Sequence, residues 1–169
     1  QQRMACALKH FPGSGNNVDT HTGIAVDHRP YETFMESDFL PFAAGIEEGA
    51  PMVLVSHNIV NCMDSEHPAS LSPEVHRVLR EDLGFTGLIL TDDLSMEAIP
   101  AYTGGENPCA AAINAGNDLL LSSDLQADYN ALLAAVQDGT VTEERLDESV
   151  LRILAMKCCT QYQLERVVG

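Results

Sequence analysis

Four short, continuous apolar runs constrain the fold of this 169-residue chain most strongly. Each run ends in polar residues, and segments with helical spacing separate the runs. Continuous apolar runs are typical of strands that are buried on both faces, as in parallel sheets. Strands that alternate with helices predict an α/β fold with parallel strands and right-handed crossovers. The runs are Met4–Leu8, Met52–Val55, Leu88–Leu90 and Leu119–Leu121.

The segments between and after these runs predict five helices from their capping residues and apolar spacing. Ser72-Pro73 is the clearest start, because serine caps a helix N-terminus and proline fits the first helical position. Glycines that follow the segments favour their C-terminal ends. The predicted helices cover about residues 37–48, 73–83, 106–115, 125–137 and 143–156, with Ser37 and Thr142 as further caps.

The carboxyl ends of parallel strands meet at one edge of a sheet, where α/β proteins place their sites. A strand and its helix take about 40 residues here, whereas an eight-unit barrel typically needs roughly 250 residues. The chain therefore predicts either a small open sheet or half of a barrel. The polar residues expected on the shared rim are Lys9, His10, His57, Asp92, Asp93 and Ser123.

The charge of the chain limits its partners. It carries 9 Lys and Arg against 25 Asp and Glu, which gives a net charge of -16. This argues against nucleic acid or an anionic membrane as a partner, because both are bound by a surplus of basic residues. No apolar stretch approaches the roughly 20 residues of a membrane helix, and no secretory signal is recognisable. Cysteines without a Cys-x-x-Cys pair favour reduced thiols, so we expect a cytoplasmic protein.

The first chemical motif is Lys9–Gly15, which leads into a polar loop that extends to about Pro30. Asp19 and His21 lie two residues apart in this loop, so in an extended segment their side chains point the same way. The carboxylate can then fix the imidazole tautomer and raise the basicity of the other ring nitrogen, as in catalytic dyads. The alternative is a solvated loop with a local turn.

The second motif, Gly84–Met96, places two carboxylates at the end of the third apolar run. Asp92 directly follows the run and is expected to face the sheet's cavity. Asp93 is placed to cap the turn that follows. The alternative is that both carboxylates are structural caps.

The other polar rim residues have two interpretations each. Lys9 and His10 are suited to bind sugar hydroxyls or a phosphate, or they form an ordinary surface pair. His57 lines the same cavity, or it is a rim histidine whose hydrogen bonds are satisfied within the protein. The histidine spacing matches no zinc pattern and no glycine-rich phosphate loop is present, so no metal ion or other cofactor is predicted.

At these two motifs the sequence resembles family 3 glycoside hydrolases, and among them the bacterial β-N-acetylhexosaminidases of cell-wall recycling. The resemblance runs along nearly the whole chain but covers only strands five to eight of the family's (β/α)8 TIM barrel. It implies that residues 1–169 are the C-terminal half of the catalytic domain, without the first half. The matching stretches are Lys9–Gly15, Asp19–His21, Leu40–Phe42, Met52–His57, Leu83–Met96 and Ala115–Asp118.

The resemblance also implies roles for the rim residues. Asp92 would be the nucleophile of a retaining mechanism, and His21, polarised by Asp19, would be the general acid/base. A close carboxylate stabilises the oxocarbenium charge of glycoside cleavage, and histidine donates a proton near neutral pH. Lys9 and His10 would bind N-acetylglucosamine hydroxyls, with His57 near that subsite. The expected substrates are peptidoglycan-derived muropeptides.

Two departures from the family pattern leave alternatives open. Ser14 stands where the family usually has histidine, and the sugar-binding residues of the earlier strands are absent. An isolated half would expose a sheet edge and an apolar barrel interior, so we expect a separate N-terminal half or self-association. The alternatives are an inactive or carbohydrate-binding half-barrel and a β-glucosidase-type enzyme. Asp93 counts against the β-glucosidase, because those enzymes usually have Trp there.

Overall fold

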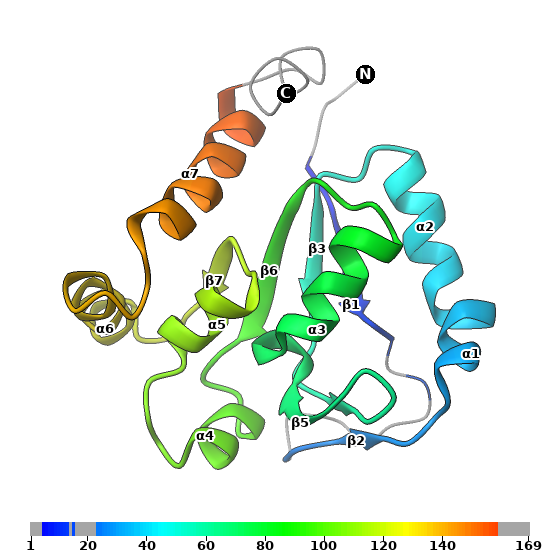
Figure 1. The fold of residues 1–169 in the computed structure, drawn as a ribbon, viewed down its shortest axis with the longest axis horizontal. Coiled ribbons are helices and arrows are strands. Elements are labelled where there is room, and N and C mark those ends of the chain that lie inside the picture. Colours follow the sequence, from blue (N-terminus) through cyan, green and yellow to red (C-terminus); the bar gives the residue numbers. More distant parts are fainter. Residues whose placement is uncertain (1–4, 14, 16–22, 159–169) are drawn as a thin grey trace.

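A four-stranded parallel sheet forms the centre of the computed structural model, which describes residues 5–13, 15 and 23–158 (Figure 1). The strand order is β1-β3-β6-β7, so each strand pairs with the next large strand along the chain. All three pairings are parallel. The predicted α/β fold with parallel strands is therefore confirmed. The strands are β1 (Ala7–Phe11), β3 (Met52–Val55), β6 (Leu88–Asp93) and β7 (Leu119–Leu121).

Helical segments follow each strand of this sheet. Ser72 caps α3 as predicted, because its hydroxyl accepts a hydrogen bond from the Val75 backbone N–H at 3.2 Å. Two segments are π-helical rather than α-helical. Phe34–Asp38 lies between the first two α-helices, and Val78–Asp82 directly follows the third. The α-helices are α1 (Tyr31–Thr33), α2 (Phe39–Glu47), α3 (Pro73–Arg77), α4 (Ala98–Thr103), α5 (Cys109–Ala115), α6 (Leu125–Gln137) and α7 (Glu143–Cys158).

A second, three-stranded sheet lies at the carboxyl ends of the parallel strands, at the bottom of Figure 1. It contains β2 (Val26–Asp27), β4 (Ile59–Val60) and β5 (Asp64–Pro68). The sequence did not predict this sheet, because two-residue strands carry no periodic signal and β5 is almost entirely polar. The small sheet extends the rim on which the predicted site residues lie.

The main core fills the space between one face of the parallel sheet and the helices α2 and α3. Val53, Val55 and Ile89 contribute from the strands and are fully buried. The helices contribute Phe42 and Leu79 to the same cluster. Burial of apolar surface at about 25 cal/mol per Å² makes this layer the main source of stability.

The opposite face of the parallel sheet carries a separate row of leucines. Leu54 pairs with Leu90, and Leu90 pairs with Leu119, so the three side chains share one face. None of the three belongs to the described core clusters. Leu90 and Leu119 are only partly buried. This face of the sheet is apolar, and among the described residues it is only partly covered at Leu90 and Leu119.

Several element boundaries differ from the sequence predictions. The first strand is Ala7–Phe11 rather than Met4–Leu8, because Phe11 is fully buried and pairs with Val55. The helix expected from Ser37 begins at Tyr31, directly after Pro30, whose fixed φ suits a helix entrance. The helix expected over residues 106–115 begins only at Cys109. No helix of the described residues is both long and apolar enough to cross a membrane.

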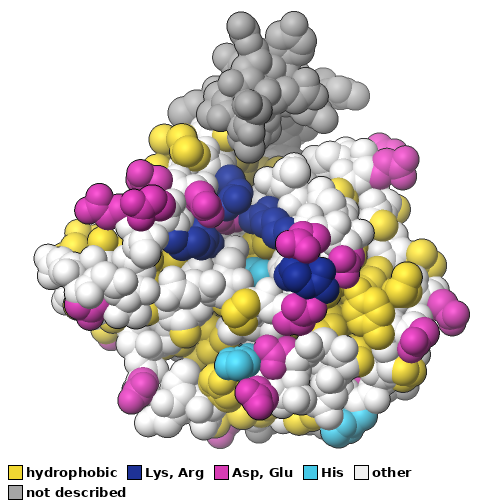
Figure 2. Space-filling model, viewed as in Figure 1, with side chains coloured by type: hydrophobic (Ala, Val, Ile, Leu, Met, Phe, Trp, Pro, Cys, Tyr) yellow, Lys and Arg dark blue, Asp and Glu magenta, His cyan; other side chains and the backbone are white. Residues whose placement is uncertain are grey.

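A buried carboxylate attaches α7 to the amino-terminal edge of the sheet. Asp118, directly before β7, accepts hydrogen bonds from Arg80 of the α3 segment at 2.7 Å and from Arg152 of α7 at 2.9 Å. Ser149 donates to the same carboxylate at 2.9 Å, and an Arg145 nitrogen lies 4.0 Å from it. Asp118 is thus shared by three guanidinium groups. Figure 2 shows the basic side chains of this face gathered between α7 and α3.

Two buried histidines, His57 and His76, are expected to make the stability of the fold depend on pH. Burial lowers the pKa of both from the ordinary 6.5. Below about pH 6.5 the unfolded chain therefore binds protons that the folded chain does not, and the free energy of unfolding falls as the pH falls. Each histidine contributes at most about 1.4 kcal/mol per pH unit.

Urea unfolding measures the contribution of His76 to this pH dependence. The unmodified chain and His76→Gln are compared between pH 7.5 and 5.5, about one pH unit either side of the ordinary histidine pKa. The variant is expected to show the shallower loss of stability, because it lacks one titrating group. Equal slopes for the two proteins would contradict the assignment. Comparison of slopes, rather than of absolute stabilities, removes the effect of the other acidic groups.

Candidate active site

His10 of β1 and Asp92 of β6 face each other at the carboxyl ends of their strands. His10 Nε2 lies 3.7 Å from Asp92 Oδ2, and the two side chains are 36% and 23% exposed. Both side chains therefore combine a fixed position with access to solvent. Lys9, directly before His10, is exposed. The Lys9–His10 and Phe11–Pro12 peptide bonds are cis.

The two adjacent carboxylates, Asp92 and Asp93, have different environments. Asp92 Oδ1 accepts the Asp93 backbone N–H at 2.9 Å, while Oδ2 faces His10. The Asp93 carboxylate accepts from the Ser123 hydroxyl at 2.7 Å and from both the backbone N–H and the hydroxyl of Ser95. The Ser123 hydrogen bond, followed by the Ser95 N–H, holds the pKa of Asp93 below its usual value. Asp93 thus stabilises the turn after β6, whereas Asp92 directs one carboxylate oxygen toward His10.

His57 follows β3 and is fully buried beneath this rim. Its Nδ1 lies 2.7 Å from the Ser70 hydroxyl, and its Nε2 lies 2.9 Å from the Asp93 carbonyl oxygen. Burial lowers the pKa of His57, so the ring is neutral at neutral pH. This geometry favours the satisfied rim histidine over the cavity-lining one. A direct contact with a sugar would require one of the two hydrogen bonds to open.

The predicted dyad, Asp19 and His21, lies outside the residues that the structure describes, as does Ser14. The described residues on either side of the segment are Gly13, Gly15 and the chain from Gly23 onward. These residues show how the two ends of the segment are held.

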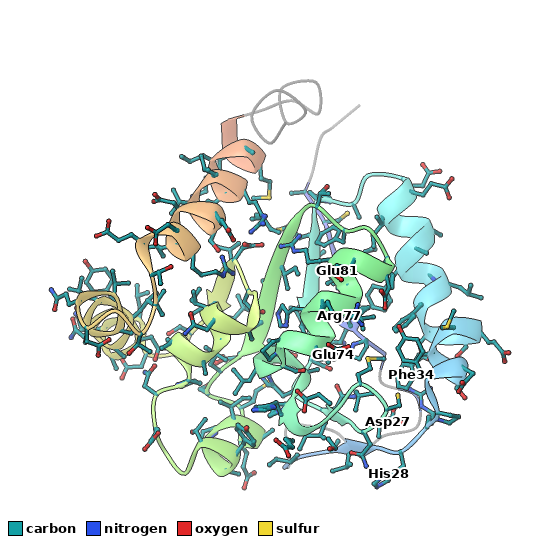
Figure 3. All side chains as sticks on the ribbon, in the orientation of Figure 1. Asp27, His28, Phe34, Glu74, Arg77 and Glu81 are labelled. Atoms are coloured by element: carbon teal, nitrogen blue, oxygen red, sulfur yellow. The ribbon has the colours of Figure 1, made fainter. Side chains whose placement is uncertain are left out.

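An ion-pair clamp that the sequence analysis missed holds these ends. Arg29 donates to Asp27 through Nη2 at 2.8 Å and to Asp38 through Nη1 at 2.9 Å. Its guanidinium lies 4.3 Å from the centre of the Phe34 ring. Figure 3 shows Asp27 and Phe34 together at the lower right, where β2 leads into α1. The Asp-x-Arg spacing was visible in the sequence, but nothing local indicated Asp38 as the second partner.

The clamp also explains the glycines of the first motif. Gly13 has a φ of +132°, and a Cβ atom there would overlap the Asp38 side chain. A Cβ atom at Gly15 would lie 2.6 Å from the Arg29 guanidinium carbon. The backbone of the loop therefore passes directly against the clamp, which only glycine allows without displacement.

A cavity of about 190 Å³ lies near the rim, beside Leu94 and Thr103, between the end of β6 and the loop after α4. Its lining includes neither His10 nor Asp92. In the part of the chain that the structure describes, no group of three or more His, Cys, Asp or Glu side chains is arranged to hold a metal ion.

Comparison with known proteins places this arrangement in a family. Residues 1–156 match the family described as glycosyl hydrolase family 3 N terminal domain. A curated β-hexosaminidase from Xylella fastidiosa (strain M12) is 38% identical over 132 residues, which are 78% of this chain and 39% of that protein. The chain thus spans about two fifths of the length of this relative.

Solved structures show the same similarity. A family 3 β-N-acetylglucosaminidase from Paenibacillus sp. str. FPU-7 superposes with a TM-score of 0.86 at 35% identity, covering 98% of this chain and 32% of that chain. The β-glucoside phosphorylase BglX superposes with a TM-score of 0.84 at 31% identity, covering 90% of this chain and 30% of that one. The chain therefore belongs to glycoside hydrolase family 3, within the N-terminal domain of that family.

Proposed function

We propose that this chain carries the catalytic groups of a retaining β-N-acetylhexosaminidase that removes β-linked N-acetylglucosamine. The observation that carries the proposal is the open Asp92 carboxylate opposite His10 on the rim of the sheet. The names of the relatives, a β-hexosaminidase and a β-N-acetylglucosaminidase, support this choice of substrate. Muropeptides derived from peptidoglycan are the natural substrates that we propose, and the cytoplasm is the proposed location.

The proposed reaction proceeds in two steps. Asp92 attacks the anomeric carbon and forms a glycosyl-enzyme ester, while the bond to the leaving oxygen breaks and His21 donates a proton to that oxygen. Water then attacks the same carbon and gives a proton to His21. The bond between that carbon and Asp92 breaks, which restores the carboxylate. Asp19 orients His21, and Lys9 and His10 bind the sugar hydroxyls. Histidine suits the acid/base role because its pKa lies near neutrality.

We further propose that the parallel sheet is the second half of a (β/α)8 barrel. The leucine row on the open face and the unpaired outer edges of β1 and β7 within the described sheet support this assignment. The chain covers 39% and 32% of the lengths of two relatives. We expect shares of this size if the chain is half of a barrel and the relatives have further residues outside their barrels. The partner of this face would be the first half of the barrel, on the same or another polypeptide, or a second copy of this chain.

A rate comparison tests the proposed function. The protein is assayed with p-nitrophenyl N-acetyl-β-glucosaminide and with p-nitrophenyl β-glucoside, both alone and with the first half of the barrel supplied. We expect turnover of the N-acetylglucosaminide, at the higher rate of the two. A preference for the glucoside would favour the β-glucosidase alternative, to which the similarity with a β-glucoside phosphorylase points. Binding of N-acetylglucosamine without turnover in either format would favour the carbohydrate-binding half-barrel.

A further inference from the structure

His57 joins the ends of two strands through side-chain contacts that the proposed reaction does not use. It follows β3, whereas its Nε2 partner, the Asp93 carbonyl, ends β6. The N–H of the same residue, Asp93, is hydrogen-bonded to Asp92 Oδ1 at 2.9 Å. Asp93 thus links the imidazole to the proposed nucleophile. Its carbonyl oxygen contacts His57, and its N–H donates to Asp92.

The protonation state of His57 follows from its partners. A carbonyl oxygen only accepts hydrogen bonds, so Nε2 carries the proton and donates it to Asp93. In the neutral ring Nδ1 then accepts the hydroxyl hydrogen of Ser70. Burial favours this neutral form. The ring therefore has a single orientation in which both nitrogens are satisfied.

The far side of His57 is anchored as firmly as the side toward Asp93. Ser70 is fully buried, and its carbonyl accepts the Asn117 side-chain amide at 2.7 Å. Asn117 is itself fully buried, and the same amide group also donates to the Ala112 carbonyl of α5 at 2.7 Å. The path of hydrogen bonds thus runs from α5 through Ser70 and His57 to the end of β6. A ring held from both sides restricts the movement of the Asp93 peptide.

We infer that His57 is a positioning residue, which holds the Asp93 peptide and through it fixes the Asp92 carboxylate in the orientation for attack on the anomeric carbon. This inference rests on the proposed function of Asp92. It gives His57 no contact with the sugar. Loss of the Nε2 hydrogen bond would let the end of β6 shift, and a misplacement of about 1 Å can cost a reaction roughly a hundredfold in rate.

N-acetyl-β-glucosaminyl fluoride tests the inference, because fluoride leaves with little help from an acid and its release reports mainly on the nucleophile. His57→Leu is expected to lower kcat by roughly ten- to a hundredfold while KM changes by less than about twofold. His57→Gln is expected to restore most of kcat, because its amide nitrogen has a reach similar to Nε2 and can donate to Asp93. His57→Asn, which is one methylene shorter, is expected to remain slow.

Val141→Ala is the control. Val141 is fully buried, but it packs in the cluster with Ile113 and Ala135 and has no part in the path from Asn117 to Asp93. We expect this variant to lose stability and keep the kcat of the unmodified protein. The comparison separates an effect on the nucleophile from a general loss of folded protein.

Each outcome of the experiment decides something. A His57→Leu protein with unchanged kcat would overturn the inference, as would a His57→Gln protein no faster than His57→Asn. If His57→Leu does not fold, the Gln and Asn variants alone decide, because both retain a polar side chain. If the unmodified protein, with the first half of the barrel supplied, releases no fluoride, the proposed function itself fails, and the inference fails with it.

Discussion

Replacement of Asp92 by Ala is expected to lower kcat for an N-acetylglucosaminide by about three orders of magnitude or more. The Asp92 side chain combines exposure to solvent with a fixed place opposite His10, as a nucleophile requires. Removal of the carboxylate takes away the group that is proposed to form the glycosyl-enzyme ester. Neighbouring Asp93 cannot replace it, because three hydrogen bonds hold its carboxylate in the turn after β6.

Chemical rescue and a matched variant separate this loss from misfolding. Added azide should restore turnover of an activated substrate by Asp92→Ala and should give the glycosyl azide of inverted configuration, because azide enters from the side that the carboxylate occupied. Asp93→Asn should lower kcat by about tenfold or less, because that side chain acts only on the turn. An Asp92→Ala protein with more than about a tenth of the original kcat would contradict the assignment.

The second large effect concerns stability rather than catalysis. Asp118→Ala is expected to lower the free energy of unfolding by about 3–5 kcal/mol, because it leaves buried arginines without their shared counter-charge. Burial already lowers the pKa of Arg80 to about 10, with the Asp118 charge opposing that shift. Without Asp118, the guanidinium groups of Arg80, Arg145 and Arg152 would repel one another across the junction of α3 and α7.

Urea unfolding measures this loss, and limited proteolysis locates it. Because Arg145, Ser149 and Arg152 attach α7 through Asp118, cleavage within α7 should accelerate before the rest of the domain unfolds. Asp147→Asn is the control, since it removes an exposed carboxylate from the same helix and should leave stability almost unchanged. A loss below about 1 kcal/mol for Asp118→Ala would indicate that the arginines find other partners.

Elements with clear local signals were predicted closely from the sequence. The bounds of β3, β7 and α6 agree with the predictions, and Ser72 caps its helix as expected. Strands that continue into polar residues were predicted too short. β1 includes His10 and β6 includes Asp92 and Asp93, because side chains at the rim of a sheet need not be apolar. Polarity indicated the rim of the sheet, but it placed the ends of these strands too early.

The contacts that organise the site depend on long-range packing, which spacing in the sequence does not reveal. His57 and the Asp93 carbonyl are 36 residues apart, and the two interpretations of His57 could be weighed only once both partners were visible. Arg29 meets Asp38, nine residues further along, across a helical segment whose start was itself predicted too late. The roles of Asp19 and His21 remain predictions, because both lie outside the described residues.

Mass spectrometry of a trapped glycosyl-enzyme tests the central claim most directly. The protein, with the first half of the barrel supplied, is incubated with a 5-fluoro N-acetylglucosaminyl fluoride, which forms the covalent intermediate quickly and hydrolyses slowly. Digestion and peptide mapping then locate the added sugar. We expect an adduct on Asp92 that is absent from Asp92→Ala. An adduct on any other residue, or steady turnover of substrate with no adduct at all, would contradict the role of Asp92 as the nucleophile.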